Sequence, residues 1–283
     1  MFTLKIENAK GEILDLSSNS NYSVVGISGL NPPGATLSTA AITTNDGSIL
    51  NNSRIESRNL VFNIILNGNI ESSRINLYKY FRVKQKCKIH YKNGSRNVYI
   101  EGYIETFEDD FFVQRQEVQI SVMCYQPFFK AAHDLVIDLS VVLAAFEFPF
   151  DIESTGKEFS VLERKRECLL FNEGEVDNGL IIEIRATGTV FNPTIYNADT
   201  REFIGLNYTM INGDLITINT NVGEKSVTLL REGTNSNLIN YLKKDSTWLM
   251  AYSGDNVYTY SSEEGTEDFL NIRFIHTHQY LGV

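Results

Sequence analysis

The stretch Cys87-Lys88-Ile89-His90-Tyr91-Lys92-Asn93-Gly94-Ser95-Arg96-Asn97-Val98-Tyr99-Ile100 decides the fold class of the first half of the chain. Apolar and polar residues alternate on both sides of Asn93-Gly94. Period-two alternation is typical of a half-buried strand, and Asn-Gly is the strongest short-range hairpin signal. The pattern predicts two antiparallel strands joined by a type I′ turn.

Similar segments lie on both sides of this hairpin, separated by turn residues such as Asn31-Pro32-Pro33-Gly34. The further strand candidates are Phe2–Glu7, Val24–Leu30, Asn59–Asn67, Gly102–Glu105 and Gln116–Cys124. Residues 1–133 are therefore predicted to form a mainly β domain, β-barrel-like or a β-sandwich, with one helix.

That helix is predicted just after Ser72 and Ser73, which are suitable N-caps. Leu77, Tyr80 and Phe81 follow at the spacing i, i+3, i+4, so they share one face of the helix and should point to the core.

The opposite face of the helix carries the cations Arg74, Lys79 and Arg82. Two interpretations stay open: a charged contact between subunits, or a solvated face. Residues 35–54, before the helix, are rich in Thr, Ser, Asn and Gly, with few apolar anchors. They are predicted to form an exposed arm or hairpin.

Residues 134–165 are predicted to be a connector, in which Phe148-Pro149-Phe150 is apolar enough to dock on another surface. Residues 166–283 contain short strand candidates separated by polar turns, with a helix conceivable only at Ser236–Leu242. About eight such strands predict a β-sandwich of the jelly-roll type. The candidates are Leu180–Arg185, Phe191–Tyr196, Phe203–Met210, Leu215–Asn219, Ser226–Leu230, Trp248–Tyr252, Val257–Ser261 and Leu270–His276.

Composition supports two ordered units and excludes several classes of protein. The chain has 283 residues, of which 42% are hydrophobic and 21% charged, so it is not a disordered protein. Residues 1–133 hold 14 Lys and Arg against 12 Asp and Glu, a net +2, whereas residues 134–283 hold 11 against 23, a net -12. The acidic second half argues against a DNA-binding function.

The longest apolar stretch, Val141–Phe146, is far shorter than a membrane span of about 20 residues. The first residues lack the apolar core of a signal peptide, so folding in a cytoplasm is expected. The three cysteines, Cys87, Cys124 and Cys168, are far apart in sequence, which argues against a disulfide framework or a zinc site.

Candidates for chemistry are few. None of the sequence motifs GxGxxG, GxxxxGK[ST], GxSxG or HExxH occurs. His276 and His278 would point to one side of a strand, either as metal ligands or as a polar face. Cys124 with His133 is either a nucleophile and its base or a buried thiol and an unrelated histidine. No cofactor or metal and no enzymatic activity is expected.

Acidic residues are concentrated at Glu105, Glu108, Asp109 and Asp110, but spacing alone does not mark a catalytic pair among them. Trp248 is the single tryptophan. Trp248, Met250 and Tyr252 alternate onto one face, which is predicted to face the core. The alternative is an exposed Trp248 that stacks on a sugar.

The chain resembles the distal tail protein family of tailed bacteriophages over nearly its whole length. In the first half the resemblance is carried by Ser73–Leu77, Ile89–Gly94, Ile100–Glu105, Gln119–Cys124 and Pro127–Phe129. In the second half it is carried by Leu170–Gly174, Thr187-Gly188, Asn192–Asn197, Gly213–Thr220, Gly223–Val227, Ser246–Leu249, Gly254–Tyr258 and Tyr280–Val283.

This resemblance implies a structural protein of the virion tail tip, made in the cytoplasm of the host bacterium. The N-terminal domain, residues 1–133, would form a hexameric ring that joins the tail tube to receptor-binding or other tip proteins. DNA would pass through the channel without specific recognition, and no membrane is involved. The C-terminal domain, residues 166–283, would be a galectin-like sandwich whose last strand returns towards the N-terminal domain.

A galectin-like fold raises the alternative function of binding host cell-wall glycans through the C-terminal sandwich. Galectins grip galactose with neighbouring His, Asn, Pro and Arg residues on one strand. The corresponding segment here is Val190-Phe191-Asn192-Pro193-Thr194, in which Val190 and Thr194 replace the His and the Arg. Binding of galactosides in that mode is therefore not expected.

Overall fold

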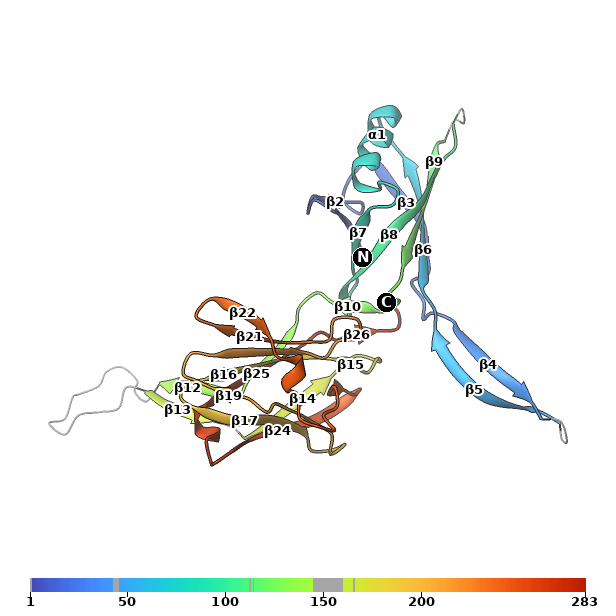
Figure 1. Cartoon of the computed structure of the whole chain (residues 1–283). Coiled ribbons are helices and arrows are strands. Elements are labelled where there is room, and N and C mark those ends of the chain that lie inside the picture. Colours follow the sequence, from blue (N-terminus) through green and yellow to red (C-terminus); the bar gives the residue numbers. More distant parts are fainter. Residues whose placement is uncertain (1, 43–45, 112, 114, 145–159, 165) are drawn as a thin grey trace. The chain divides into compact units, whose positions relative to one another are not determined.

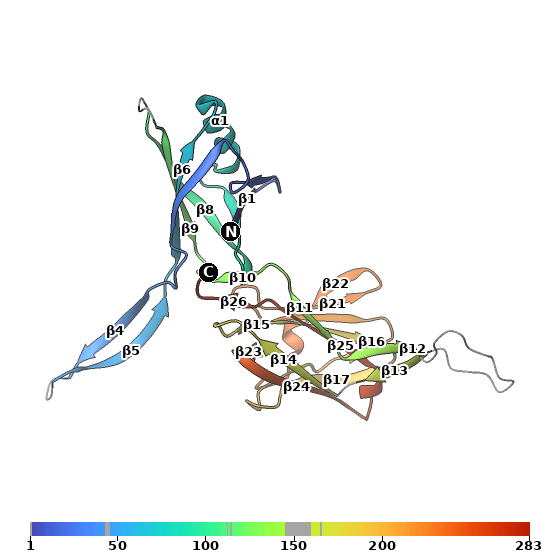
Figure 2. The ribbon, with the colours of Figure 1, turned by 180° about the vertical axis from the view of Figure 1, so that it is seen from behind.

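The structure is a computed structural model that describes residues 2–42, 46–111, 113, 115–144, 160–164 and 166–283. The chain is mainly β, as the sequence predicts, and it forms two compact units (Figures 1 and 2). The first unit contains residues 1–132 and 279–283, and the second contains residues 133–278. Phe148-Pro149-Phe150, predicted to dock, lies outside the described residues.

The first unit is built on an antiparallel sheet in which seven strands follow the order β2-β1-β7-β8-β9-β6-β3. Two short strands extend this sheet, because β10 pairs with both β8 and β26. The bounds are β1 Thr3–Asn8, β2 Ile13–Asp15, β3 Tyr22–Ser28, β6 Arg58–Leu66, β7 Lys86–Lys92, β8 Asn97–Asp109, β9 Glu117–Cys124, β10 Phe129–Ala131 and β26 Gln279–Tyr280.

The predicted hairpin forms between β7 and β8, with Ile89 opposite Ile100. Its turn is not type I′, which needs positive φ at both central residues, because neither Asn93 nor Gly94 has a positive φ. The loop has four residues, since Lys92 is the last paired residue of β7 and Asn97 the first of β8. Asn93 Oδ1 accepts hydrogen bonds from the backbone N–H groups of Ser95 (3.0 Å) and Arg96 (2.7 Å), so this side chain organises the turn.

The helix α1 spans Ile70–Tyr80 and begins earlier than predicted. Its N-cap is Asn69, whose Oδ1 accepts a hydrogen bond of 3.2 Å from the backbone N–H of Ser72. The prediction that Ser72 and Ser73 are the caps is therefore wrong. The predicted apolar face is confirmed, because Leu77 and Phe81 are buried in the core.

The predicted arm or hairpin of residues 35–54 is a hairpin, in which β4 (Ala35–Ala41) pairs with β5 (Ser48–Ile55). It is a separate two-stranded sheet, and no third strand in the described part of the chain pairs with it (Figure 1). Every described residue of its two strands is exposed. We call this hairpin the arm.

The second unit is a β-sandwich of two main antiparallel sheets. The six-stranded sheet has the order β11-β25-β16-β20-β21-β22, and the five-stranded sheet has the order β14-β24-β17-β18 with β19 beside β17. The bounds are β11 Leu135–Asp138, β14 Glu167–Asn172, β16 Ile181–Ala186, β17 Val190–Asn197, β18 Phe203–Gly205, β19 Thr209–Met210, β20 Leu215–Asn219, β21 Ser226–Arg231, β22 Thr234–Asn237, β24 Gly254–Glu263 and β25 Leu270–His276. Two small ribbons accompany them, β12 Ser140–Ala144 with β13 Ser160–Arg164 and β15 Asn178–Gly179 with β23 Met250–Ala251.

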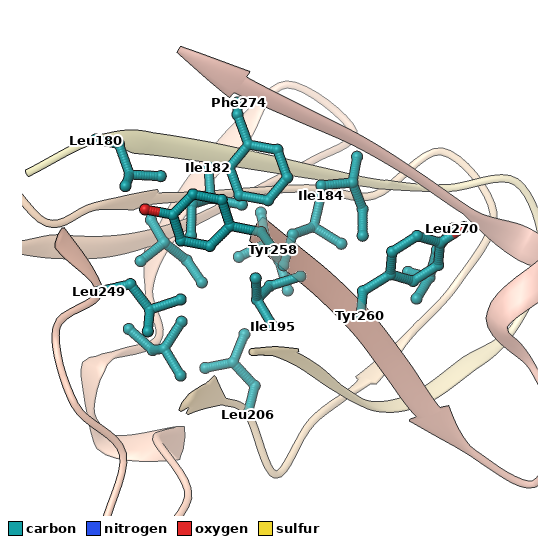
Figure 3. Close-up of a cluster of buried hydrophobic side chains, with 14 of the residues drawn as sticks. Leu180, Ile182, Ile184, Ile195, Leu206, Leu249, Tyr258, Tyr260, Leu270 and Phe274 are labelled. Carbon is teal, nitrogen blue, oxygen red and sulfur yellow. The ribbon is translucent and has the colours of Figure 1, made fainter. Parts of the chain in front are cut away.

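The core of the second unit lies between its two main sheets. Ile182 and Phe274 point inward from the six-stranded sheet, and Ile195 and Tyr258 from the five-stranded sheet (Figure 3). The rings of Tyr258 and Phe274 stack with centroids 5.1 Å apart. Side chains of both sheets therefore interlock in one buried layer.

Three details differ from the sequence predictions. Leu135–Asp138, predicted within the connector, is strand β11, because Leu135 and Ile137 pack against the sandwich core. Residues Ser236–Leu242 contain only the 3-10 helix η1, Ile239–Tyr241, after the end of β22. A second 3-10 helix, η2, spans Glu267–Phe269.

The C-terminal residues belong to the first unit, where β26 pairs with β10. The guanidinium of Arg58 is buried, lies over the ring of Phe129 and donates to the carbonyl of Leu281. Arg96 donates to the carbonyl of Gly282 and lies over the ring of Tyr280. We call residues 279–283 with these two arginines the C-terminal clasp.

Candidate assembly and binding surfaces

The arm has two chemically different faces. Because side chains alternate along a strand and paired residues share a face, Leu37, Leu50 and Ile55 lie on one face together with the smaller Ala35, Thr39, Ala41, Ser48 and Ser53. Leu37 and Leu50 are 60% and 56% exposed. We call this the apolar face of the arm. The other face carries Thr36, Ser38, Ala40, Ile49, Asn52 and Arg54.

An isolated two-stranded hairpin is at best marginally stable in water, and exposed leucine side chains add an unfavourable hydration cost. The arm is therefore suited to being covered by another surface. Its apolar face is hard to detect in the sequence, because Ser38 pairs with Asn52 and Thr39 with Leu50, which leaves Asn51 as a bulge. The bulge breaks the period-two alternation along β5.

The three predicted interface cations have different environments. The side chain of Arg74 is only 13% exposed, since it forms ion pairs with Glu71 and with Asp109, the latter at 3.4 Å, and lies over the ring of Phe111. Lys79 is exposed in the last turn of the helix, and Arg82 is exposed but follows the end of the helix, so its predicted place on the helix is wrong. The fold thus ties Arg74 to the β8 strand and leaves only Lys79 and Arg82 fully accessible to a partner.

Trp248 is half-buried and packs against the edge of the sandwich core, with Lys225 Nζ 5.5 Å from its ring. The prediction that Trp248, Met250 and Tyr252 face the core is wrong. Leu249 and Ala251 are the fully buried residues, whereas Met250 and Tyr252 share the half-buried side with Trp248. Part of the indole is therefore accessible to solvent.

The galectin-like segment lies on β17 at an irregularity in its pairing with β24. Asn192 has a positive φ of 50°, and its amide donates to Glu263 Oε2 at 2.6 Å. Thr194 is buried. No His or Arg stands at the positions where the galectin motif has them, so this strand does not carry the galectin donor set.

His276 is fully buried, and its ring meets the ring of His278 edge-on with centroids 5.1 Å apart. Burial, and then the neighbouring His278, lower the pKa of His276 to about 4. His278 is hydrogen bonded to Asn172 Oδ1 at 3.1 Å, and burial lowers its pKa as well. Among the residues that the structure describes, no group of three His, Cys, Asp or Glu side chains is placed to hold a metal ion.

The three cysteines lie in the interior of the protein. Cys87, Cys124 and Cys168 are all buried and free, and burial raises the pKa of each thiol to about 12. The raised pKa keeps the Cys124 thiol protonated at neutral pH, whereas an activated cysteine nucleophile is a thiolate. His133 is exposed in the second unit.

The carboxylates near the β8–β9 hairpin have structural contacts. Glu105 accepts a hydrogen bond from Ser121 Oγ at 3.0 Å, and Asp109 pairs with Arg74. No helix in the described part of the chain is long and apolar enough to cross a membrane.

Comparisons with known proteins agree with this architecture. Residues 173–278 match the family model "Siphovirus-type tail component, C-terminal domain". No curated protein matches the chain by sequence.

Solved structures share the fold over the whole chain. The crystal structure of SPP1 Dit (gp 19.1), described as a paradigm of the hub adsorption apparatus in phages that infect Gram-positive bacteria, matches with a TM-score of 0.70 and 12% identity over 99% of both chains. A chain of the phage P2 baseplate in its activated conformation with Ca matches with a TM-score of 0.56 and 11% identity over 100% of both chains. Together with the family model, these matches confirm that the chain resembles the distal tail protein family.

Proposed function

We propose that the chain is a distal tail protein of a phage virion, a structural hub without catalytic activity. Copies assemble through the first unit into a closed hexameric ring at the tail tip. The ring joins the tail tube to the host-recognition proteins and leaves a channel for DNA. The observation that carries this proposal is the similarity to a hub protein over 99% of both chains, which includes both units.

In this proposal, the second unit points outward from the ring, and the tip proteins attach to it. The family-model match over residues 173–278 supports that role, because that family is a tail component.

The arm supports self-assembly. A ring needs heterologous contacts, in which one surface of a subunit meets a different surface of its neighbour. An arm with an apolar face and exposed strands provides one half of such a contact, because it can bury Leu37, Leu50 and Ile55 on an adjacent copy.

Native mass spectrometry and negative-stain imaging of the chain, alone and with its tail tube protein, test this proposal. The expected result is a closed ring whose assembly is lost or weakened in Leu50→Ser. Ile49→Ser is the matched control, because Ile49 is 59% exposed and lies on the other face of the same strand. A strictly monomeric chain under all conditions, or equal effects of the two substitutions, contradicts the proposal.

A second candidate function is glycan binding through the second unit. The observation that favours it is a polar groove on the outer face of the six-stranded sheet, lined by Asp138, Glu183, Arg185 and Arg273 among other residues. The half-buried Trp248 is the other candidate for contact with a sugar, and it does not line this groove.

A further inference from the structure

The outer face of the six-stranded sheet carries a continuous row of polar side chains. Register pairs place one residue from each strand side by side, from β11 through β22. The row is Asp138, Arg273, Glu183, Thr217, Thr228 and Asn237. The residues before and after these on the strands, such as Ile182 and Ile272, fill the core. The row is therefore the solvent side of the sheet.

The charged end of this row is held in place by its own contacts. Arg273 Nε donates to Asp138 Oδ1 at 2.6 Å, and Arg273 Nη1 lies 3.5 Å from Glu183 Oε2. The side chain of Arg273 thus bridges two carboxylates from neighbouring strands. Such a bridge orders the polar groups before any ligand arrives, which reduces the entropy lost on binding.

A groove of about 370 Å³ lies over this network. A second row of paired residues on the same face of the sheet also lines the groove. It consists of Asn271, Arg185 and Leu215, which lie side by side on β25, β16 and β20. Arg185 is exposed. The groove therefore offers guanidinium and amide donors, carboxylate and amide acceptors, and the apolar residues Leu215 and Ile272, within a space that fits a small saccharide.

The charge balance of the groove selects the class of ligand. Asp138 and Glu183 offset Arg185 and Arg273, so the lining is neutral overall. Residues 134–283 carry a net charge of -12, which disfavours the approach of polyanions. A hydroxyl group both donates and accepts hydrogen bonds, so a chain of hydroxyls matches alternating guanidinium and carboxylate groups better than an ion does.

We propose that this groove binds a neutral, hydroxyl-rich glycan, with Arg185, Glu183 and Asn271 as the contacting residues. The proposal rests on the second candidate function above and names its site and ligand class. The lining residues include no aromatic ring on which a sugar could stack, so each site binds weakly. Copies presented together on a ring would raise the apparent affinity by avidity.

An array of neutral, carboxylated and sulfated oligosaccharides, probed with the full-length protein, tests the ligand class. Isothermal titration with the neutral oligosaccharide that the array retains best then gives Kd for each variant. Arg185→Leu is expected to weaken this Kd at least tenfold. Arg201→Leu is the matched control, because Arg201 is an exposed arginine of the same unit outside the groove, and its Kd should stay within twofold of wild type.

Trp248 fluorescence during urea unfolding verifies that both variants remain folded. If no oligosaccharide on the array is retained, glycan binding and the groove proposal both fail. If a neutral oligosaccharide binds but Arg185→Leu binds like wild type, or if charged oligosaccharides are preferred, the assigned site or ligand class is wrong while glycan binding stands. Ring assembly is measured separately, so neither result bears on the hub function.

Discussion

Deletion of residues 279–283 should destabilise the first unit alone. The deletion removes β26 and the carbonyls of Leu281 and Gly282, which accept hydrogen bonds from Arg58 and Arg96. It also removes Tyr280 and Val283, which pack against the core of the first unit. Arg58 is 4% exposed, so its cation would remain buried without one of its acceptors.

The size of the effect follows from these contacts. A hydrogen bond with a charged donor contributes about 1.5–3 kcal/mol, so losing the two carbonyl acceptors costs roughly 3–6 kcal/mol. A domain of this size has a total stability of about 5–15 kcal/mol. The first unit should therefore melt roughly 10–20 °C lower in the truncated chain.

The assay uses the position of the single tryptophan. Trp248 lies in the second unit, so its fluorescence reports only on that unit, whereas far-UV circular dichroism reports on both. Truncation should lower the Tm of a circular dichroism transition and leave the fluorescence transition in place. An unchanged circular dichroism profile, or an equal shift in both signals, would refute the assignment of residues 279–283 to the first unit as a structural clasp.

Other substitutions test the core and the turns. Gly94→Val should change the free energy of unfolding by less than about 0.5 kcal/mol, since no atom lies within 4 Å of an added Cβ. Gly102→Ala should cost about 1–3 kcal/mol, because its Cβ would meet Val122 Cγ1 at 2.7 Å. Urea denaturation measures both, and equal midpoints of the two variants would contradict the register of β8. Trp248→Ala should cost about 1–3 kcal/mol by circular dichroism, less than a fully buried tryptophan, and a larger loss would show a deeper indole. The folded pKa of His276 is about 4, below its ordinary value of 6.5, so the unfolded chain takes up this proton more readily and the second unit should lose up to about 3 kcal/mol as pH falls from 6.5 to 4. His276→Leu should flatten that pH dependence, and an unchanged slope would show that other groups cause it.

Strands were predictable from the sequence wherever alternation was strong. Ile89 and Ile100 face the core because one face of the hairpin is buried, and such a pattern is visible locally. The turn type was not predictable, because Asn93 accepts two backbone hydrogen bonds that compete with the type I′ conformation.

Whether Trp248 faces the core could also not be predicted from the sequence. β23 contains only Met250 and Ala251, and its parity is set by pairing with β15, about 70 residues earlier in the chain. In a strand this short, the sequence offers two equally good apolar sets, and the smaller Leu249 and Ala251 occupy the core while the larger tryptophan stays at its edge.

The surface residues depend most on contacts distant in sequence. Arg74 shares the polar face of a helix with Lys79, but its pairing with Asp109 follows only from the tertiary fold. The polar row over the six-stranded sheet likewise joins residues as far apart as Asp138 and Arg273. Such sites become visible only when the strand order is known.

The most direct test of the account is the mass and image of the particles that the full chain forms with its tail tube protein. The account predicts a closed ring of six copies around an open channel, and loss of that ring in Leu50→Ser but not in Ile49→Ser. A homogeneous monomer that does not associate with the tube would contradict it.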